Sequence, residues 1–161
     1  MSRADQALET RQKLLDNALL LFSEQGYSKT SIRALARKVG LSDGILYHHF
    51  PQGKQQILNV LLTQGVQQAL TQLNQFNQDL EHSPLEKVLH TLCELCVQLF
   101  SNNKALLKVI LRESENMQLS EIHIISQLFQ SRQQWLTALL QQRALQHEIR
   151  DMDFNIAAQQ F

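Results

Sequence analysis

The chain has 161 residues, enough for one ordinary domain or for two small helical domains that share a core. Its 43% of hydrophobic residues can form a core, two prolines and five glycines are too few for a many-stranded sheet, and no apolar run approaches the roughly 18 residues of a membrane span. The formal net charge is zero, but residues 1–54 carry eight Lys and Arg against five Asp and Glu, an excess that points weakly to a polyanionic partner.

Helical spacing of apolar residues predicts three short helices before Pro51. The first ends at Gly26, a residue type that suits the C-terminal stop of a helix. The second begins at Thr30, whose hydroxyl we expect to cap it, and ends at Gly40. The third begins at a second capping residue, Ser42, and cannot continue through the proline. The apolar positions of the three helices are Leu14, Leu15, Ala18, Leu21 and Phe22; Ile32, Leu35, Ala36 and Val39; and Ile45, Leu46 and Phe50.

Further helices are predicted in the rest of the chain. Their expected ranges are 54–76, 84–100, 104–115, about 119–146 and a short helix from 154. Residues 77–83 are expected to form a connection, with Ser83 as the cap of the helix that follows it and Asp153 as the cap of the last helix. That last helix stops after two turns at an apolar residue, Phe161, so we expect the natural protein to continue. The prediction is an all-α fold with a helix-turn-helix domain at 1–53 and a larger helical domain, truncated at its end, at 54–161.

The segment from Thr30 to Phe50 has the form of a helix, a tight turn and a second helix. Gly40 permits the turn because it adopts backbone conformations that cost other residues free energy. If the apolar faces pack on the first helix, the third helix presents its other face, which carries Asp43, Gly44, Tyr47 and His48. Small or polar residues at a helix N-terminus can enter the major groove of DNA, where the helix N–H groups attract phosphate.

Residues 11–57, RQKLLDNALLLFSEQGYSKTSIRALARKVGLSDGILYHHFPQGKQQI, closely resemble the N-terminal domain of the TetR family of bacterial transcription regulators. The matching residues are Arg11, Leu14, Ala18, Phe22, Gly26, Tyr27, Thr30, Ile32, Leu35, Ala36, Gly40, Ser42, Gly44, Leu46, Tyr47, His49, Phe50, Lys54 and Leu58. The resemblance covers about a third of the chain and is specific, because many residue types agree at fixed spacing. It departs from the family where Pro51, Gln52 and Gly53 lengthen the loop before Lys54.

The resemblance implies a homodimer with a small DNA-binding domain and a larger C-terminal domain for ligand binding and dimerisation. Its expected partners are double-stranded DNA with a palindromic operator and a small-molecule effector of unknown identity. The implied function is sequence-specific transcription regulation, most commonly as a repressor that the ligand releases from its operator.

Nine residues are predicted to contact DNA. They are Thr30, Ser31, Arg33, Ser42, Asp43, Gly44, Tyr47, His48 and Lys54. Tyr47, beside the apolar Leu46, is expected to face outward and to reach a phosphate through its hydroxyl. Arg33 and Arg37 share the polar face of the second helix, where solvated charge is the alternative. His48 is a DNA-facing candidate, His49 is expected to be partly packed, and Arg3 could reach a groove from a flexible arm.

The remaining chemistry-bearing residues favour no enzyme and no cofactor. Cys93 and Cys96, with His90 three residues earlier, lack a fourth metal ligand, and a redox pair normally lies at a helix N-terminus. We therefore expect both cysteines to be buried as small hydrophobes. Two such cysteines form no disulfide framework, and the polar start of the chain precedes no apolar signal core, so a cytoplasmic location is expected.

Four residues of the C-terminal part could line a cavity for a small apolar effector: Phe100, Met117, Phe129 and Trp135. The alternative is that they are ordinary core residues, as aromatic residues on helices usually are. No phosphate loop, nucleophile elbow or carboxylate pair supports catalysis. A helical module that binds only a protein partner is the other class of function, and it would lack salt-dependent binding to duplex DNA.

Overall fold

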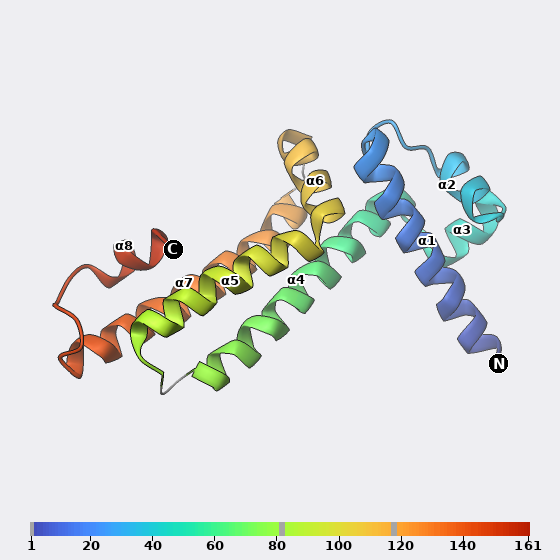
Figure 1. Cartoon of the computed structure of the whole chain (residues 1–161). Helices are drawn as coiled ribbons and strands as arrows, with labels where there is room; N and C mark the ends of the chain where they lie inside the picture. Colours follow the sequence, from blue (N-terminus) through green and yellow to red (C-terminus); the bar gives the residue numbers. More distant parts are fainter. Residues whose placement is uncertain (1, 81–82, 117–118) are drawn as a thin grey trace. The chain divides into compact units, whose positions relative to one another are not determined.

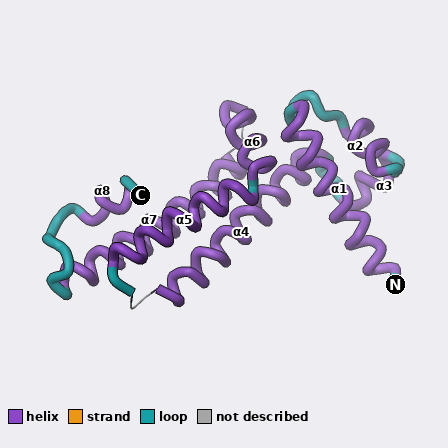
Figure 2. The backbone as a smooth tube through the Cα atoms, in the orientation of Figure 1, coloured by secondary structure: helices purple, strands orange, loops and turns teal. Residues whose placement is uncertain are grey.

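The computed structural model describes residues 2–80, 83–116 and 119–161, and Figures 1 and 2 show that they form helices joined by loops. The elements are α1 (Arg3–Gln25), α2 (Ile32–Val39), α3 (Asp43–His49), α4 (Lys54–Leu80), α5 (Leu85–Asn102), α6 (Lys104–Glu113), the 3-10 turn η1 (Ser114–Asn116), α7 (Leu119–Leu145) and α8 (Phe154–Gln159). These three ranges contain no strand, which confirms the all-α prediction. No described helix is both long and apolar enough to cross a bilayer.

The chain divides into two compact units that do not coincide with two continuous stretches of sequence. The first unit combines residues 1–65 with 100–121, and the second combines 66–99 with 122–161. Helices α4, α5 and α7 therefore contribute residues to both units. The boundary expected after residue 53 separates a DNA-binding part from a ligand-binding part, and it stays a prediction.

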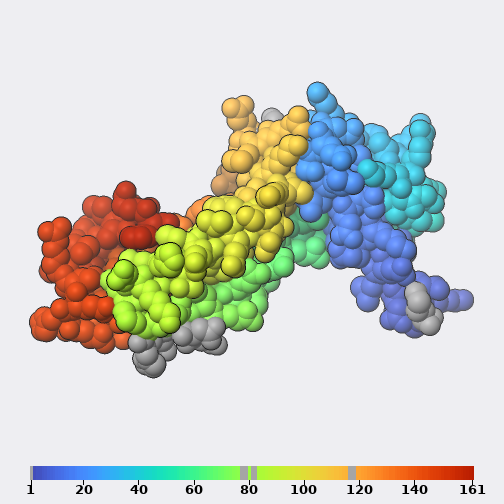
Figure 3. Space-filling model, viewed as in Figure 1, coloured from blue at the N-terminus to red at the C-terminus, as the bar shows by residue number. Residues whose placement is uncertain are grey.

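The first unit is held together by helices α1, α2, α3, α6 and the first part of α4. Helix α1 packs against α2 and α6, and α2 packs against α3. In the space-filling view the α6 surface adjoins that of α1 (Figure 3). The side chains without exposed surface in this unit are Leu14, Leu15, Ala18, Phe22, Leu35, Ala36, Leu46, Phe50, Ile57, Leu62 and Val109.

Helix α1 begins earlier than its apolar pattern indicates. The Ser2 hydroxyl accepts a hydrogen bond from the Asp5 N–H (3.1 Å), and the Asp5 carboxylate accepts one from the Ser2 N–H (2.8 Å). This reciprocal pair satisfies two of the donors that a helix start leaves unpaired. Arg3, expected in a flexible arm, is therefore the first residue of α1.

The second unit has its own apolar core, formed by residues of α4, α5, α7 and α8. Its buried members are Leu73, Phe76, Leu80, Leu85, Val88, Leu92, Leu136, Leu139, Leu140 and Ala158. Because Leu80 continues the helical spacing of buried residues, α4 runs to residue 80 and the connection predicted from residue 77 was placed too early. Asp153 caps α8 through the Ile156 N–H (3.0 Å), as predicted.

The start of α5 is capped from another part of the second unit. The Glu148 carboxylate accepts a hydrogen bond from the Leu85 N–H (2.9 Å) and pairs with Arg143 (2.9 Å). Arg143, 8% exposed, also donates to the Ser83 carbonyl. This three-part contact ties the α5 start to the end of α7, and no local sequence pattern indicates it.

The cysteines differ from their expected burial. Cys93 is exposed and Cys96 is half-buried, since both lie on a side of α5 that the core does not cover. His90 lies near Glu94 (3.4 Å) and not in a ligand cluster. Within the described ranges no group of three or more His, Cys, Asp or Glu side chains could hold a metal ion.

Candidate nucleic-acid interface

The turn between α2 and α3 is built by Gly40. Its backbone is left-handed (φ +75°), a conformation that glycine adopts without the cost that a Cβ imposes. The Gly40 N–H donates to the Arg37 carbonyl (3.1 Å), and the Leu41 N–H donates to the Ala36 carbonyl (2.9 Å). These bonds satisfy carbonyls at the end of α2 and redirect the chain into α3 within three residues. The predicted helix, turn and helix are therefore present.

The caps of the two helices agree with the sequence prediction in one helix only. Ser42 caps α3, accepting from the Ile45 N–H (3.4 Å), as predicted. Ser31, not Thr30, caps α2, accepting from the Ala34 N–H (3.1 Å). The Thr30 hydroxyl instead donates to the Gly26 carbonyl (2.8 Å), and the residue is only 1% exposed. The prediction that Thr30 caps α2 was therefore wrong, and the Thr30 side chain has almost no exposed surface for contact with a ligand.

Helix α3 has one packed face and one open face. Leu46 and the following Phe50 have no exposed surface, and the Arg11 guanidinium lies 4.9 Å from the Phe50 ring centre. Gly44, Tyr47 and His48, spaced as neighbours on one side of a helix, are all exposed. Their open face is the one that the sequence assigned to DNA. Ile45, expected in the core, is 43% exposed.

A hollow of about 540 Å³ lies beside this open face, where the loop before α2 meets the loop before α4. It is lined by Ser28, Lys29, Thr30, Ser31, Ile32, Tyr47, Pro51, Gln52, Gly53 and Lys54. A Cβ added to Gly53, whose φ is +63°, would lie 3.4 Å from the Tyr47 ring. The Tyr47 hydroxyl has no hydrogen-bond partner among the described residues, and the side chain is 48% exposed.

Lys54 is engaged inside the protein. Its ammonium donates to the carbonyls of Tyr27 (2.9 Å), Thr30 (3.2 Å) and Ser28 (3.4 Å). It also lies 4.4 Å from the centre of the Tyr27 ring, within the range of a cation–π contact. An ammonium has three donors. The Lys54 side chain therefore holds the loop between α1 and α2, and the phosphate contact predicted for it would require one of these bonds to be exchanged.

The charged residues around α3 that were predicted to contact DNA make only exposed contacts with one another. Arg33 and Asp43 form an ion pair across the turn (3.8 Å), with side chains 78% and 46% exposed, so water screens their attraction. The His48 and His49 rings meet edge to face with centres 5.6 Å apart. Partial burial lowers the pKa of His49 below its ordinary value, and the neighbouring His48 and Arg11 lower it further.

Sequence reasoning missed several residues of this surface, among them two with long polar side chains. Lys29 and Gln52 line the hollow beside Tyr47, although neither belongs to the two helices of the motif. The signal for Lys29 was available, since it is a cation shortly before the start of α2. Gln52 lies in the lengthened loop, whose path the sequence left open.

The predicted effector residues belong to different compact units. Phe100 belongs to the first unit and is 55% exposed, whereas Phe129 of the second unit is 53% exposed. Trp135 packs edge to face on Phe76 (5.7 Å) at the margin of the second core. Met117 lies outside the described residues. The effector cavity therefore stays a prediction.

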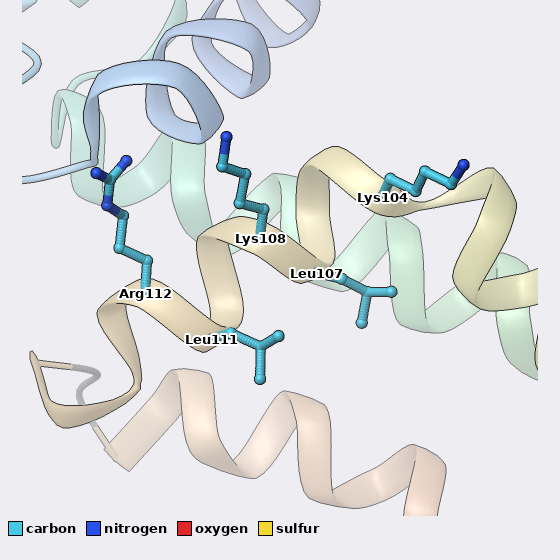
Figure 4. Close-up of a pocket in the computed structure, with 5 residues that line it drawn as sticks. All are labelled: Lys104, Leu107, Lys108, Leu111 and Arg112. Carbon is cyan, nitrogen blue, oxygen red and sulfur yellow. The ribbon is translucent and has the colours of Figure 1, made fainter.

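An open groove of about 560 Å³ runs along α6, lined by Lys104, Leu107, Lys108, Leu111 and Arg112 (Figure 4). Lys108 and Arg112 leave the helix on one side, and Leu107 and Leu111 on the other. None of the predicted effector residues lines this groove.

Comparison with known proteins identifies the N-terminal part of the chain. Residues 14–61 match the model of a family described as bacterial regulatory proteins, tetR family. The HTH-type transcriptional regulator AcrR of Shigella flexneri is 51% identical over 45 residues, which are 28% of this chain and 21% of that protein. A probable acrEF/envCD operon repressor of Escherichia coli strain K12 is 31% identical over 114 residues, 68% of this chain and 50% of that protein.

The fold agrees over a longer stretch than the sequence does. A solved bacterial regulatory protein of the tetR family from Rhodococcus RHA1 aligns with a TM-score of 0.77 at 19% identity, covering 98% of this chain and 78% of that one. That likeness concerns the fold alone, and the aligned part of this chain spans half or less of the two curated relatives. Residues 14–61 of this chain therefore belong to the tetR family of bacterial regulatory proteins.

Proposed function

We propose that this protein binds duplex DNA with α3 in the major groove and regulates transcription as a repressor. The observation that carries the proposal is the open face of α3. Gly44, Tyr47 and His48 are exposed on a short helix whose opposite side is fixed by the buried Leu46 and Phe50. A rigid helix with a bare N-terminal turn suits close approach to base edges.

The hollow beside α3 suits a DNA phosphate. Lys29 supplies a positive charge, Tyr47 supplies a hydroxyl without an internal partner among the described residues, and Gln52 supplies a side-chain amide. Such groups fix the register of a protein on the duplex but carry no sequence information. We therefore assign positioning on the backbone to the hollow, and base reading to Gly44 and His48.

A homodimer on a near-palindromic operator is part of the proposal. One recognition helix reads only a few base pairs, and two helices held one DNA turn apart multiply the specificity. A small, largely apolar molecule is the proposed effector, bound among the helices beyond the DNA-binding part. It would lower DNA affinity only if it bound the released state more tightly than the DNA-bound state.

The test begins by selecting duplexes from a random pool with the full chain and measuring their affinity at several salt concentrations. We expect affinity to fall steeply with salt, because phosphate contacts displace counterions. Tyr47→Phe, which removes only the hydroxyl, should weaken binding to selected and random duplexes equally, since phosphate contacts do not depend on sequence. The matched control is Ser126→Ala, which removes a hydroxyl of the second unit that bonds the His123 carbonyl (2.9 Å).

Binding that is weak, insensitive to salt and unchanged by Tyr47→Phe would refute this assignment. A chain that bound a protein partner but no duplex would support the alternative of an interaction module. The effector is sought afterwards, by screening apolar compounds for displacement of the selected duplex.

A further inference from the structure

The loop between α1 and α2 is held from two sides by opposite charges. The Lys54 ammonium bonds three of its carbonyls, as described above. On the other side, the Glu113 carboxylate of α6 accepts hydrogen bonds from the Tyr27 N–H (3.1 Å) and from the Ser28 hydroxyl (3.2 Å). We call this arrangement of Lys54, Tyr27, Ser28 and Glu113 the loop clamp.

Glu113 occupies an unfavourable place for a carboxylate. It is the last residue of α6, where the helix dipole disfavours negative charge, and it is only 6% exposed. A buried charge is tolerated when hydrogen bonds compensate for lost hydration. The two donors from the loop supply that compensation, so the contact is a specific one and not a chance meeting of surface groups.

Gly26 shows how closely the loop and the carboxylate fit. Its φ of +96° is one that residues with a side chain rarely adopt, and a Cβ there would lie 3.3 Å from the Glu113 Oε1. Beside it, the Arg112 side chain extends from α6 and donates to the Glu24 carbonyl (3.3 Å) (Figure 4). Two successive residues of α6 therefore bond the end of α1 and the loop after it.

A second set of contacts reaches the same loop through its tyrosine. The Tyr27 hydroxyl donates to Gln55 (2.8 Å), whose amide donates to the buried Glu121 carboxylate. Burial raises the pKa of Tyr27 above its ordinary value, and Glu121 and Glu113 raise it further. The loop is thus bonded to residues far along the chain that belong to the same compact unit.

We propose that Glu113 is a positioning residue for DNA binding, which acts by holding the loop that leads into the helix-turn-helix. This inference rests on the proposed DNA-binding function. The loop runs directly into Ser31 and α2, so its position sets where α2 and α3 begin. The DNA-binding unit of this protein therefore includes residues 100–121 as well as the N-terminal helices.

The test uses the full chain and the selected duplex, with three variants near the end of α6. Glu113→Leu keeps the approximate shape but removes the acceptor, and should weaken binding about tenfold, the effect of losing a charged hydrogen-bond partner. Glu113→Gln keeps one acceptor and should restore most of the affinity. The control Glu115→Leu removes the same charge from an exposed position two residues away.

An effect of charge alone would change the DNA affinity in the opposite direction. Removing a negative charge near a DNA-binding surface should strengthen attraction to a polyanion, so Glu115→Leu should bind as well as the natural chain or better. Thermal melts establish that each variant is folded at the temperature of the assay. If Glu113→Leu is unstable, Ser28→Ala removes one donor from the loop side and should weaken binding about threefold.

Amide hydrogen exchange reports on the clamp directly. The Tyr27 N–H should exchange faster in Glu113→Leu than in Glu115→Leu, because only the first variant removes its acceptor. Equal DNA affinity for these two folded variants would overturn the inference while leaving the proposed function intact. If the natural chain bound no duplex at all, the proposed function would fail first, and the positioning role would fall with it.

Discussion

Two glycines of the helix-turn-helix should respond in opposite ways to the same substitution. Gly44 lies in the first turn of α3 with ordinary helical backbone, and a Cβ there would meet only the Ser42 Oγ at 3.9 Å. Gly44→Ala should therefore stabilise the fold by about 0.5 kcal/mol, because glycine costs a helix conformational entropy. Gly40 also faces open space, but its φ is +75°, so Gly40→Ala should cost about 1–2 kcal/mol.

The two variants should thus differ by about 2 kcal/mol, or roughly 4–8 °C in Tm for a chain of this size. Their DNA affinities add a second contrast. Gly44→Ala should weaken binding to the selected duplex although it stabilises the protein, because its methyl projects from the face proposed to approach the bases. Thermal melts and fluorescence anisotropy measure the two effects. Destabilisation by Gly44→Ala, or unchanged DNA affinity in that variant, would refute the reasoning.

Three other predictions concern packing and pH. Phe22→Ala should cost about 3–5 kcal/mol in urea unfolding, because Phe22 has no exposed surface and its ring meets Tyr27 at 5.1 Å, whereas Leu20→Ala, at a site 42% exposed, should change stability little. The hydrogen bond from the Leu85 N–H lowers the pKa of Glu148, and Arg143 lowers it further. The ionised Glu148 therefore stabilises the fold above its ordinary pKa of 4.5, and this stabilisation is lost as the pH falls through the lower pKa of the folded state. The Tm values of the natural chain and of Glu148→Gln should therefore converge in acid. The folded pKa of His49 is also lowered, so the unfolded chain takes up its proton first, and Tm should fall below pH 6.5 more in the natural chain than in His49→Gln.

Local patterns predicted the parts of the fold that local interactions determine. The turn at Gly40, the Ser42 cap and the Asp153 cap follow from residue type and spacing, and the structure has each of them. The choice between Thr30 and Ser31 as a cap could not be made in the same way. Both residues can cap a helix, and Ser31 does so because the Thr30 hydroxyl bonds the Gly26 carbonyl.

Contacts between distant residues were beyond the reach of those patterns. Lys54 has the residue type of a phosphate ligand, yet its ammonium is bonded by a loop that lies well before it in the chain. In the sequence, Glu113 resembles an exposed acidic residue of an amphipathic helix. Its role depends on the packing of α6 against α1, which brings its carboxylate to the Tyr27 N–H. The exposure of Phe100 and Phe129 was equally hard to predict, since an apolar residue on a helix indicates a packed face without naming its partner.

The central claim is that α3 enters the major groove, and site-specific photocrosslinking tests it most directly. A photoreactive residue in place of His48 should crosslink to bases of the selected duplex, because that position lies on the open face of α3. The same residue in place of Leu20, exposed on α1, should give no crosslink to bases. Crosslinks from position 20 but not from position 48 would contradict the account.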